Sequence, residues 1–125
     1  MPTVLLVAAG GALGAVTRYG VGVWLARRDV ALPWATLLVN VLGCLALGAL
    51  MVWVSGRDDL APRVRAFVGI GLLGSLTTFS TFGLETVELM RQGETSAALT
   101  HVALNLGLGL GAVLVGRAAA LAVLD

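Results

Sequence analysis

The sequence predicts an all-α membrane protein with four transmembrane helices. Hydrophobic residues make up 58% of the 125 residues, and 17 more are glycine. This is well above the roughly 45–50% of apolar residues, glycine included, in a soluble domain. The charged residues fall between long apolar stretches, and a hydrocarbon core of about 30 Å needs about 20 residues of apolar helix. Four stretches of the chain reach that length.

The four spans are expected at about residues 3–26, 32–54, 65–90 and 96–123. Residues 1–9 lack the basic segment that begins a secretory signal, and Arg18 interrupts the apolar run, so we expect the first span to be retained. The connections are too short to fold alone, which predicts a single domain over 1–125. Four such helices cannot enclose a wide aqueous path, so a transport function would require self-association.

Small residues recur at the four-residue spacing that lets helix backbones approach closely. The pairs are Gly10 with Gly14 and Gly107 with Gly111.

The basic residues are nearly balanced between the two expected sides of the membrane. One side carries Arg27, Arg28 and Arg91, and the other carries Arg57, Arg63, Arg65 and Arg117. Because basic residues in short loops fix orientation, this balance predicts insertion both ways and an antiparallel dual-topology dimer. The alternative is a single topology fixed by another signal.

Two polar side chains within the first two spans have alternative roles. Arg18 either attracts an anion or serves as a structural anchor that binds neighbouring carbonyl groups. The Asn40 amide offers two N–H donors that can replace the water of a small anion, but asparagine also joins helices by hydrogen bonds.

The third span contains the polar and aromatic run Thr77-Thr78-Phe79-Ser80-Thr81-Phe82. Unpaired hydroxyl groups in hydrocarbon are costly, so this run indicates a functional site. Phe79 and Phe82 share one side of a helix, where ring edges would face an anion and ring faces a cation. Packing alone is the simpler role for two such rings. Glycines before the run favour a helix break whose exposed carbonyl groups bind a metal ion.

Three blocks of the sequence resemble the signature blocks of the CrcB/Fluc fluoride channels. These blocks are Gly10–Tyr19, Thr36–Gly43, and Gly74–Phe82 together with Glu85. The resemblance implies a passive fluoride-selective channel, an antiparallel dimer with two pores, a broken third helix and a structural sodium ion at the dimer centre. It also implies a multi-pass protein of the cell membrane that lets accumulated cytoplasmic fluoride leave and so reduces its toxicity.

The same resemblance implies roles for individual residues. Asn40 would donate to fluoride, and Phe79 and Phe82 would present ring edges to it. The carbonyl groups of Gly74 and Thr77 would bind sodium, and Arg18 would be structural. Further polar pore residues would be Thr36, Ser80 and Thr81, whereas the role of Glu85 stays open because a carboxylate repels anions. The partner would be a second copy or a paralogous subunit.

The fourth span departs from the family pattern, in which a tyrosine and a serine are expected. His101 and Asn105 stand there instead, four residues apart on one helix face. His101 is either a titratable group that attracts anions or a neutral hydrogen-bonding substitute.

Other functional classes fit the sequence less well. With one cysteine, one histidine and few carboxylates in the spans, the chain offers no nucleophile and base pair, so we do not expect an enzyme. A net charge of +1 predicts no nucleic-acid partner. A small multidrug-efflux transporter is the main alternative, but that class needs a carboxylate deep in its first span, and residues 1–26 contain none. A purely structural assembly subunit would need no row of polar side chains.

Overall fold

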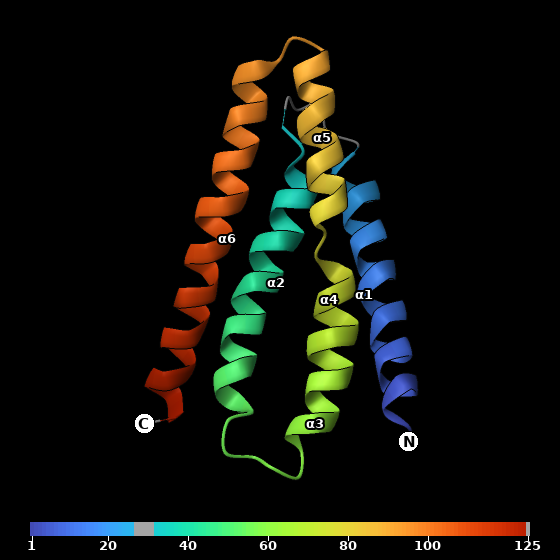
Figure 1. The fold of residues 1–125 in the computed structure, drawn as a ribbon, viewed down its shortest axis with the longest axis vertical. Coiled ribbons are helices and arrows are strands. Elements are labelled where there is room, and N and C mark those ends of the chain that lie inside the picture. Colours follow the sequence, from blue (N-terminus) through green and yellow to red (C-terminus); the bar gives the residue numbers. More distant parts are fainter. Residues whose placement is uncertain (27–31, 125) are drawn as a thin grey trace.

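The computed structural model describes residues 1–26 and 32–124, which form four long apolar helices (Figure 1). These helices are the candidate membrane spans, and their bounds lie within a few residues of the predicted ones: Thr3–Leu25, Trp34–Trp53, Ala61–Arg91 and Thr95–Leu124. The four-span, all-helical prediction is therefore confirmed for the described residues. Arg27 and Arg28, which carried part of the charge-balance argument, lie outside them.

The third span is divided into four successive pieces, whereas the other three spans are single helices. The single helices are α1 (Thr3–Leu25), α2 (Trp34–Trp53) and α6 (Thr95–Leu124). The pieces of the third span are α3 (Ala61–Val64), the π-helix η1 (Arg65–Leu73), α4 (Gly74–Leu76) and α5 (Phe79–Arg91). The break that the family resemblance implied lies between α4 and α5.

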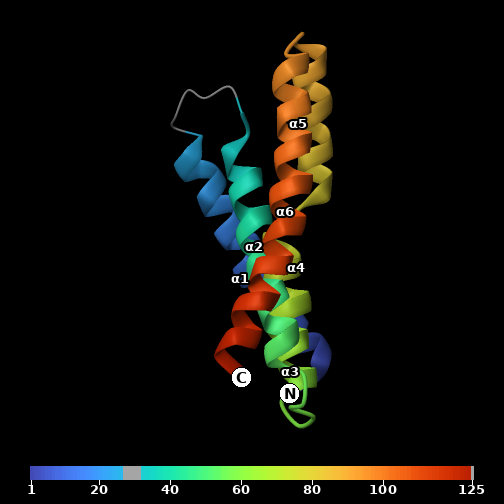
Figure 2. The same cartoon turned by 90° about the vertical axis from the view of Figure 1, so that its left-hand side faces the viewer.

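The break changes the partner of the third span. Before it, η1 and α4 pack on α1, and after it α5 packs on α6, while α2 packs along α6. Figure 2 shows the result, since the ends of α1 and α2 that face the α5–α6 turn lean away from α5 and α6. A straight helix could not follow α1 with one half and α6 with the other.

Glycines allow the close approaches between helices. A Cβ at Gly10 or Gly14 would overlap the carbonyl oxygen of Phe67 or Leu72, so α1 meets the third span backbone to backbone. The first predicted glycine pair is therefore confirmed as a contact.

The second predicted glycine pair makes no close contact within this chain, so its role in self-association stays a prediction. Gly107 and Gly111 have open space where a Cβ would stand. The close approach of α6 to α2 uses Gly116 on α6 and Gly48 on α2, because a Cβ at either position would overlap a carbonyl oxygen of the other helix. Spacing alone does not say which face of a helix meets its neighbour.

Gly93 ends α5 and starts the turn into α6. Its φ of 81° lies in the left-handed region, which glycine adopts without a Cβ penalty. The Gly93 N–H donates to Met90 O at 3.1 Å, and the Glu94 N–H donates to Leu89 O at 2.9 Å. These two bonds form a Schellman motif, which stops the helix and reverses the chain.

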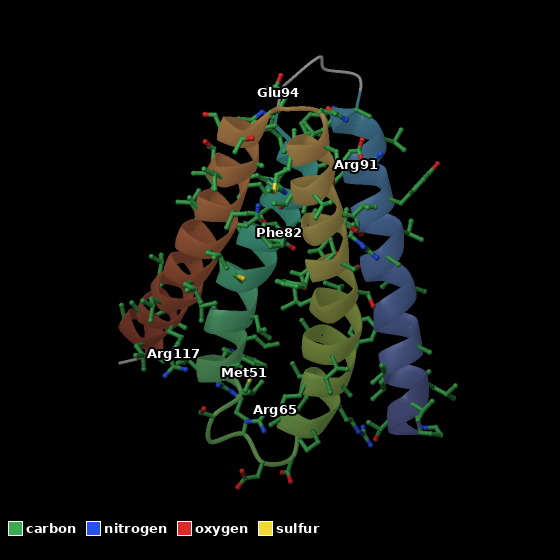
Figure 3. All side chains as sticks on the ribbon, turned by 45° about the horizontal axis from the view of Figure 1, so that its top comes forward. Met51, Arg65, Phe82, Arg91, Glu94 and Arg117 are labelled. Carbon is green, nitrogen blue, oxygen red and sulfur yellow. The ribbon has the colours of Figure 1, made fainter. Side chains whose placement is uncertain are left out.

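Charged side chains mark the two ends of the molecule (Figure 3). Arg91 and Glu94 lie at the end with the α5–α6 turn, Arg65 and Arg117 lie at the other, and Phe82 lies between them. Charges at both ends with an apolar middle are what a membrane-spanning bundle requires.

Candidate functional site: the helix break and its polar row

The third span loses its helical backbone at two residues. Thr77 has φ −82° and ψ 157°, and Thr78 has φ −154° and ψ 122°, so both are extended. Lipid offers no hydrogen bonds to an opened backbone, so the freed groups must find partners within the protein. Two side chains, from Asn40 and from Thr78 itself, supply partners for the N–H and C=O of Thr78 and for the N–H of Thr81.

Asn40 on α2 pairs with the backbone of Thr78. Its Oδ1 accepts from the Thr78 N–H at 2.8 Å, and its Nδ2 donates to Thr78 O at 3.2 Å. One amide side chain thus satisfies both backbone groups of an extended residue. Asn40 therefore acts as interhelical glue, one of the two roles that the sequence left open for it.

The Thr78 side chain caps the next helix. Its Oγ1 accepts from the Thr81 N–H at 3.2 Å and lies 3.0 Å from Thr81 Oγ1 and 3.4 Å from Ser80 Oγ. A threonine N-cap starts a helix in this way. The cap thus brings the hydroxyl groups of Thr78, Ser80 and Thr81 together.

Several carbonyl oxygens before the break lose their helical partners, and those of Gly74 and Thr77 are among them. In an unbroken helix the Thr78 N–H would bond to Gly74 O, and the Thr81 N–H would bond to Thr77 O. Both N–H groups donate to side-chain oxygens instead. The carbonyl oxygens of Gly74 and Thr77 are therefore released from the helical ladder.

A row of polar contacts runs from Asn40 into α6. Asn40 Nδ2 donates to Asn105 Oδ1 at 3.0 Å. Asn105 Nδ2 donates to His101 O at 3.0 Å and lies 3.2 Å from His101 Nδ1. His101 is 1% exposed and Asn105 is also buried. The predicted shared face of His101 and Asn105 is confirmed as a contact.

The row continues through Glu85 on α5. His101 Nε2 lies 3.3 Å from Glu85 Oε2, and Thr36 Oγ1 on α2 donates to Glu85 Oε1 at 2.8 Å. Within the described part of the chain, Nε2 and Oε2 have no hydrogen-bond partner besides this close approach. Polar side chains of α2, α5 and α6 thus connect Thr36 to Thr78 without interruption.

Three aromatic rings lie beside this row. The Phe79 and Phe82 ring centroids are 5.5 Å apart with an interplanar angle of 56°. Phe82 and His101 are 5.3 Å apart at 47°. Phe82 is 8% exposed, but Phe79 is 80% exposed. The two phenylalanines share a side of the helix as predicted, and Phe79 projects from the surface of the single chain.

Two cavities flank the break. One of about 290 Å³ is lined by Asn40, Thr78, Asn105 and both phenylalanines, and Gly74 and Thr77 also line it. The other, of about 330 Å³, lies between α1, α2 and α5 and is lined by Thr36, Thr81, Glu85 and Arg18. The structure thus brings most of the predicted polar residues to two cavities on either side of Thr78, but His101 lines neither. Ser80 is exposed and lines neither of them.

Sequence reasoning missed two features of the site. Thr78 was part of the run but had no role of its own, although a threonine three residues before Thr81 is an N-cap signal. Glu85 had no partner, because nothing in the spacing joins it to Thr36 or His101. Over residues 1–26 and 32–124 no three His, Cys, Asp or Glu side chains gather at a metal site, so the cation ligands to consider are the released carbonyl oxygens.

The chain is similar to known proteins over most of its length. Residues 5–117 match the family model described as CrcB-like protein, camphor resistance (CrcB). The protein of Rhizobium meliloti named fluoride-specific ion channel FluC is 42% identical over 119 residues, which cover 94% of this chain and 95% of that protein. The Chloroflexus aurantiacus protein of the same name is 42% identical over 117 residues, covering 93% of each chain.

A relative in Symbiobacterium thermophilum, named fluoride-specific ion channel FluC 1, is 46% identical over 116 residues, covering 91% of this chain and 94% of the relative. These matches favour an ion channel over an enzyme or a small multidrug-efflux transporter. Together with the four apolar spans, they make the chain a multi-pass membrane protein. With its three sequence blocks, its broken third span and this degree of identity, the chain belongs to the CrcB family of membrane proteins.

Proposed function

We propose that this protein is a fluoride-selective channel of the cell membrane, through which cytoplasmic fluoride leaves passively. The observation that carries the proposal is the uninterrupted polar row from Thr36 to Thr78, which passes a helix break in an otherwise apolar bundle. The fluoride-specific names of relatives at about 42% identity identify the ion.

The donors of this row suit fluoride. A small anion leaving water needs closely spaced N–H and O–H groups, and the row contains the amides of Asn40 and Asn105 and the hydroxyl of Thr36. The hydroxyls of Ser80 and Thr81 lie beside it, next to the Thr78 hydroxyl. The edges of the Phe79 and Phe82 rings add a weak positive potential without a full charge. A narrow path of this kind admits fluoride and excludes larger chloride.

No energy source beyond the membrane potential is needed. Hydrogen fluoride enters from acidic surroundings as a neutral molecule and dissociates in a near-neutral cytoplasm. A negative-inside potential then favours exit of the anion by about 2.3 kcal/mol per 100 mV. A passive channel therefore reduces fluoride toxicity.

The functional unit in this proposal is an antiparallel dimer of two identical copies inserted in opposite orientations. Phe79 is 80% exposed on the single chain, and the cavity beside it is lined by Gly74 and Thr77, whose carbonyl oxygens are released. A second copy would cover this face. A heterodimer with a paralogous subunit is the other possible assembly.

A sodium ion fits the released carbonyl groups. Hard cations prefer oxygen ligands, and carbonyl groups at helix breaks bind sodium in other membrane proteins. Gly74 and Thr77 of two copies would offer four such oxygens at the dimer centre. The ion would be structural and would make the electrostatic potential along the nearby anion path more positive. Arg18 would act as a structural cation near the second cavity.

Fluoride efflux from liposomes that contain only this protein tests the proposal. An electrode records external fluoride after a potassium ionophore collapses the opposing voltage, and chloride-loaded liposomes serve as the control. We expect fluoride to leave and chloride to stay. Equal release of both ions, or release no faster than from protein-free liposomes, would overturn the proposed function.

A further inference from the structure

The Asn40 amide has no free donor in this structure. One of its N–H groups donates to Thr78 O at 3.2 Å, and the other donates to Asn105 Oδ1 at 3.0 Å. Its Oδ1 accepts from the Thr78 N–H, and this bond distinguishes the oxygen of the amide from its nitrogen. An anion that is to be bound by Asn40 must therefore displace one of these acceptors.

The acceptor that can turn away is Asn105. Thr78 O belongs to the backbone of the break, whereas the Asn105 amide can rotate by a half turn within nearly the same volume. Asn105 Nδ2 now donates to His101 O and faces His101 Nδ1 at 3.2 Å. An N–H group facing Nδ1 requires Nδ1 to be the unprotonated ring nitrogen.

Glu85 completes this assignment. The ring proton then sits on Nε2, which lies 3.3 Å from Glu85 Oε2, while Thr36 Oγ1 donates to the other carboxylate oxygen at 2.8 Å. Nε2 and Oε2 are both buried and have no hydrogen-bond partner in the described residues, so a proton on Nε2, facing Oε2, would offer each of them a partner. Each member of the row fixes the orientation of the next, from Thr78 to Glu85.

We propose that His101 is a positioning residue for anion binding: a proton on Nδ1 reverses the Asn105 amide and frees the Asn40 donor. An imidazolium ring donates from both nitrogens, so Nδ1 would then repel the Asn105 N–H and attract Oδ1, at the cost of the bond from Asn105 Nδ2 to His101 O. The turned amide presents Nδ2 to Asn40 Nδ2. Two amide donors then converge on one point beside the Phe82 ring, which makes a site for an anion. The inference deepens the proposed function and rests on it.

One charged group near His101 would stabilise its protonated form, and another would oppose it. Glu85 on α5 is the one ionisable group within ion-pair distance of the ring among the described residues. The α2 groups in the row, Thr36 and Asn40, carry no charge. Arg18 and Tyr19 on α1 line the second cavity together with Glu85, so the positive charge of Arg18 is the group that opposes the imidazolium.

Proton and anion binding are then coupled. Because the anion site exists only with His101 protonated, fluoride must raise the proton affinity of the ring, and acid must raise the affinity for fluoride. Histidine is the side chain that changes charge between about pH 5 and 8. The channel would therefore work best in acid, the condition under which hydrogen fluoride brings fluoride into a cell.

The first test observes His101 directly, which is possible because the chain has one histidine. The full protein is labelled with ¹⁵N-histidine in lipid nanodiscs, and NMR reports the ring tautomer across a pH series with sodium fluoride or sodium chloride. We expect the Nε2–H tautomer above the titration midpoint. Fluoride should raise the midpoint by about one pH unit for a tenfold coupling, and chloride should not. An Nδ1–H tautomer, or a midpoint that ignores fluoride, would overturn the inference.

The second test uses efflux between about pH 6 and 8, with the leak of protein-free liposomes subtracted. Wild type and the matched control Thr100→Ala should release fluoride faster as pH falls. Thr100 is exposed on the same helix, and its hydroxyl donates to Ser96 O. His101→Gln cannot titrate and should lose this dependence. Wild-type efflux that is fast but flat with pH would overturn the inference and leave the channel intact. No efflux at any pH would overturn the channel as well.

Discussion

The side-chain amide of Asn40 binds both backbone groups of Thr78, as a neighbouring β-strand would in a sheet. It accepts from the Thr78 N–H at 2.8 Å and donates to Thr78 O at 3.2 Å. This pairing allows an extended residue within a transmembrane helix. It also determines the rest of the site, since it releases Gly74 O from the helical ladder and directs the second Asn40 donor to Asn105. The pairing of Asn40 with Thr78 thus stabilises the helix break and also begins the row of polar contacts.

The two phenylalanines should separate folding from conduction. Phe82 is buried, so Phe82→Ala removes core packing and should cost about 3–5 kcal/mol of stability. Phe79 is 80% exposed on the single chain, so Phe79→Ala should leave the unfolding free energy of the monomer nearly unchanged. Both variants should lose most fluoride efflux in the dimer, since both rings would line the path. Thermal unfolding in detergent and liposome efflux measure the two effects, and full efflux by Phe79→Ala would refute its place beside the anion.

Gly116 should be intolerant of a methyl group, whereas Gly107 on the same helix should accept one. A Cβ at Gly116 would overlap Leu45 O of α2, and a Cβ at Gly107 would meet open space within the chain. Overpacking of this kind costs about 1–3 kcal/mol. Gly116→Ala should therefore lower the midpoint of thermal unfolding and Gly107→Ala should not. Equal midpoints would show that the α2–α6 approach is looser than described.

Removal of sodium should weaken the dimer. If the carbonyl oxygens of Gly74 and Thr77 from two copies hold the ion, its binding at one hundred times the dissociation constant stabilises the assembly by about 2.7 kcal/mol. Replacing sodium by N-methyl-D-glucamine at constant chloride should raise the monomer fraction in dilute detergent solution, and added sodium should restore the dimer. A monomer fraction that does not depend on sodium would argue against a structural ion at the break.

Both orientations should be present in one membrane. A reactive tag is added at each terminus, and sealed vesicles are treated with an impermeant reagent from one side. About half of the tags at each terminus should react. The physical reason is the near balance of arginines at the two ends of the bundle. Adding three lysines after Leu124 should shift the labelling strongly to one side. Complete one-sided labelling of the unmodified chain would instead favour a single topology.

The spans could be predicted from the sequence, but the partners within the bundle could not. Apolar length sets where a helix crosses lipid, which is why the four predicted ranges agree with α1, α2, the third span and α6. Gly107 and Gly111 meet open space within the chain, because spacing defines a helix face without its neighbour. The sequence also did not predict the π-helix η1, which packs against α1.

In the site, too, individual residues could be predicted from the sequence, but their contacts could not. Asn40, His101 and Asn105 could be singled out because polar side chains within apolar spans are costly and need a reason. Their connection through Glu85 depends on how α5 leans on α6 after the break, which is a tertiary property. Thr78 escaped notice because its contribution comes from its backbone as much as from its side chain.

The substitution Asn40→Asp tests the central claim, that the amide at the helix break carries fluoride conduction. The aspartate keeps the volume and still accepts from the Thr78 N–H, but it cannot donate to Thr78 O, to Asn105 Oδ1 or to an anion, and it adds a negative charge. The measurement is the initial rate of fluoride efflux from liposomes, with protein taken from the folded dimer fraction and Thr100→Ala as the matched control. We predict a rate near that of protein-free liposomes for Asn40→Asp and the wild-type rate for Thr100→Ala. Efflux by Asn40→Asp at the wild-type rate would contradict the account.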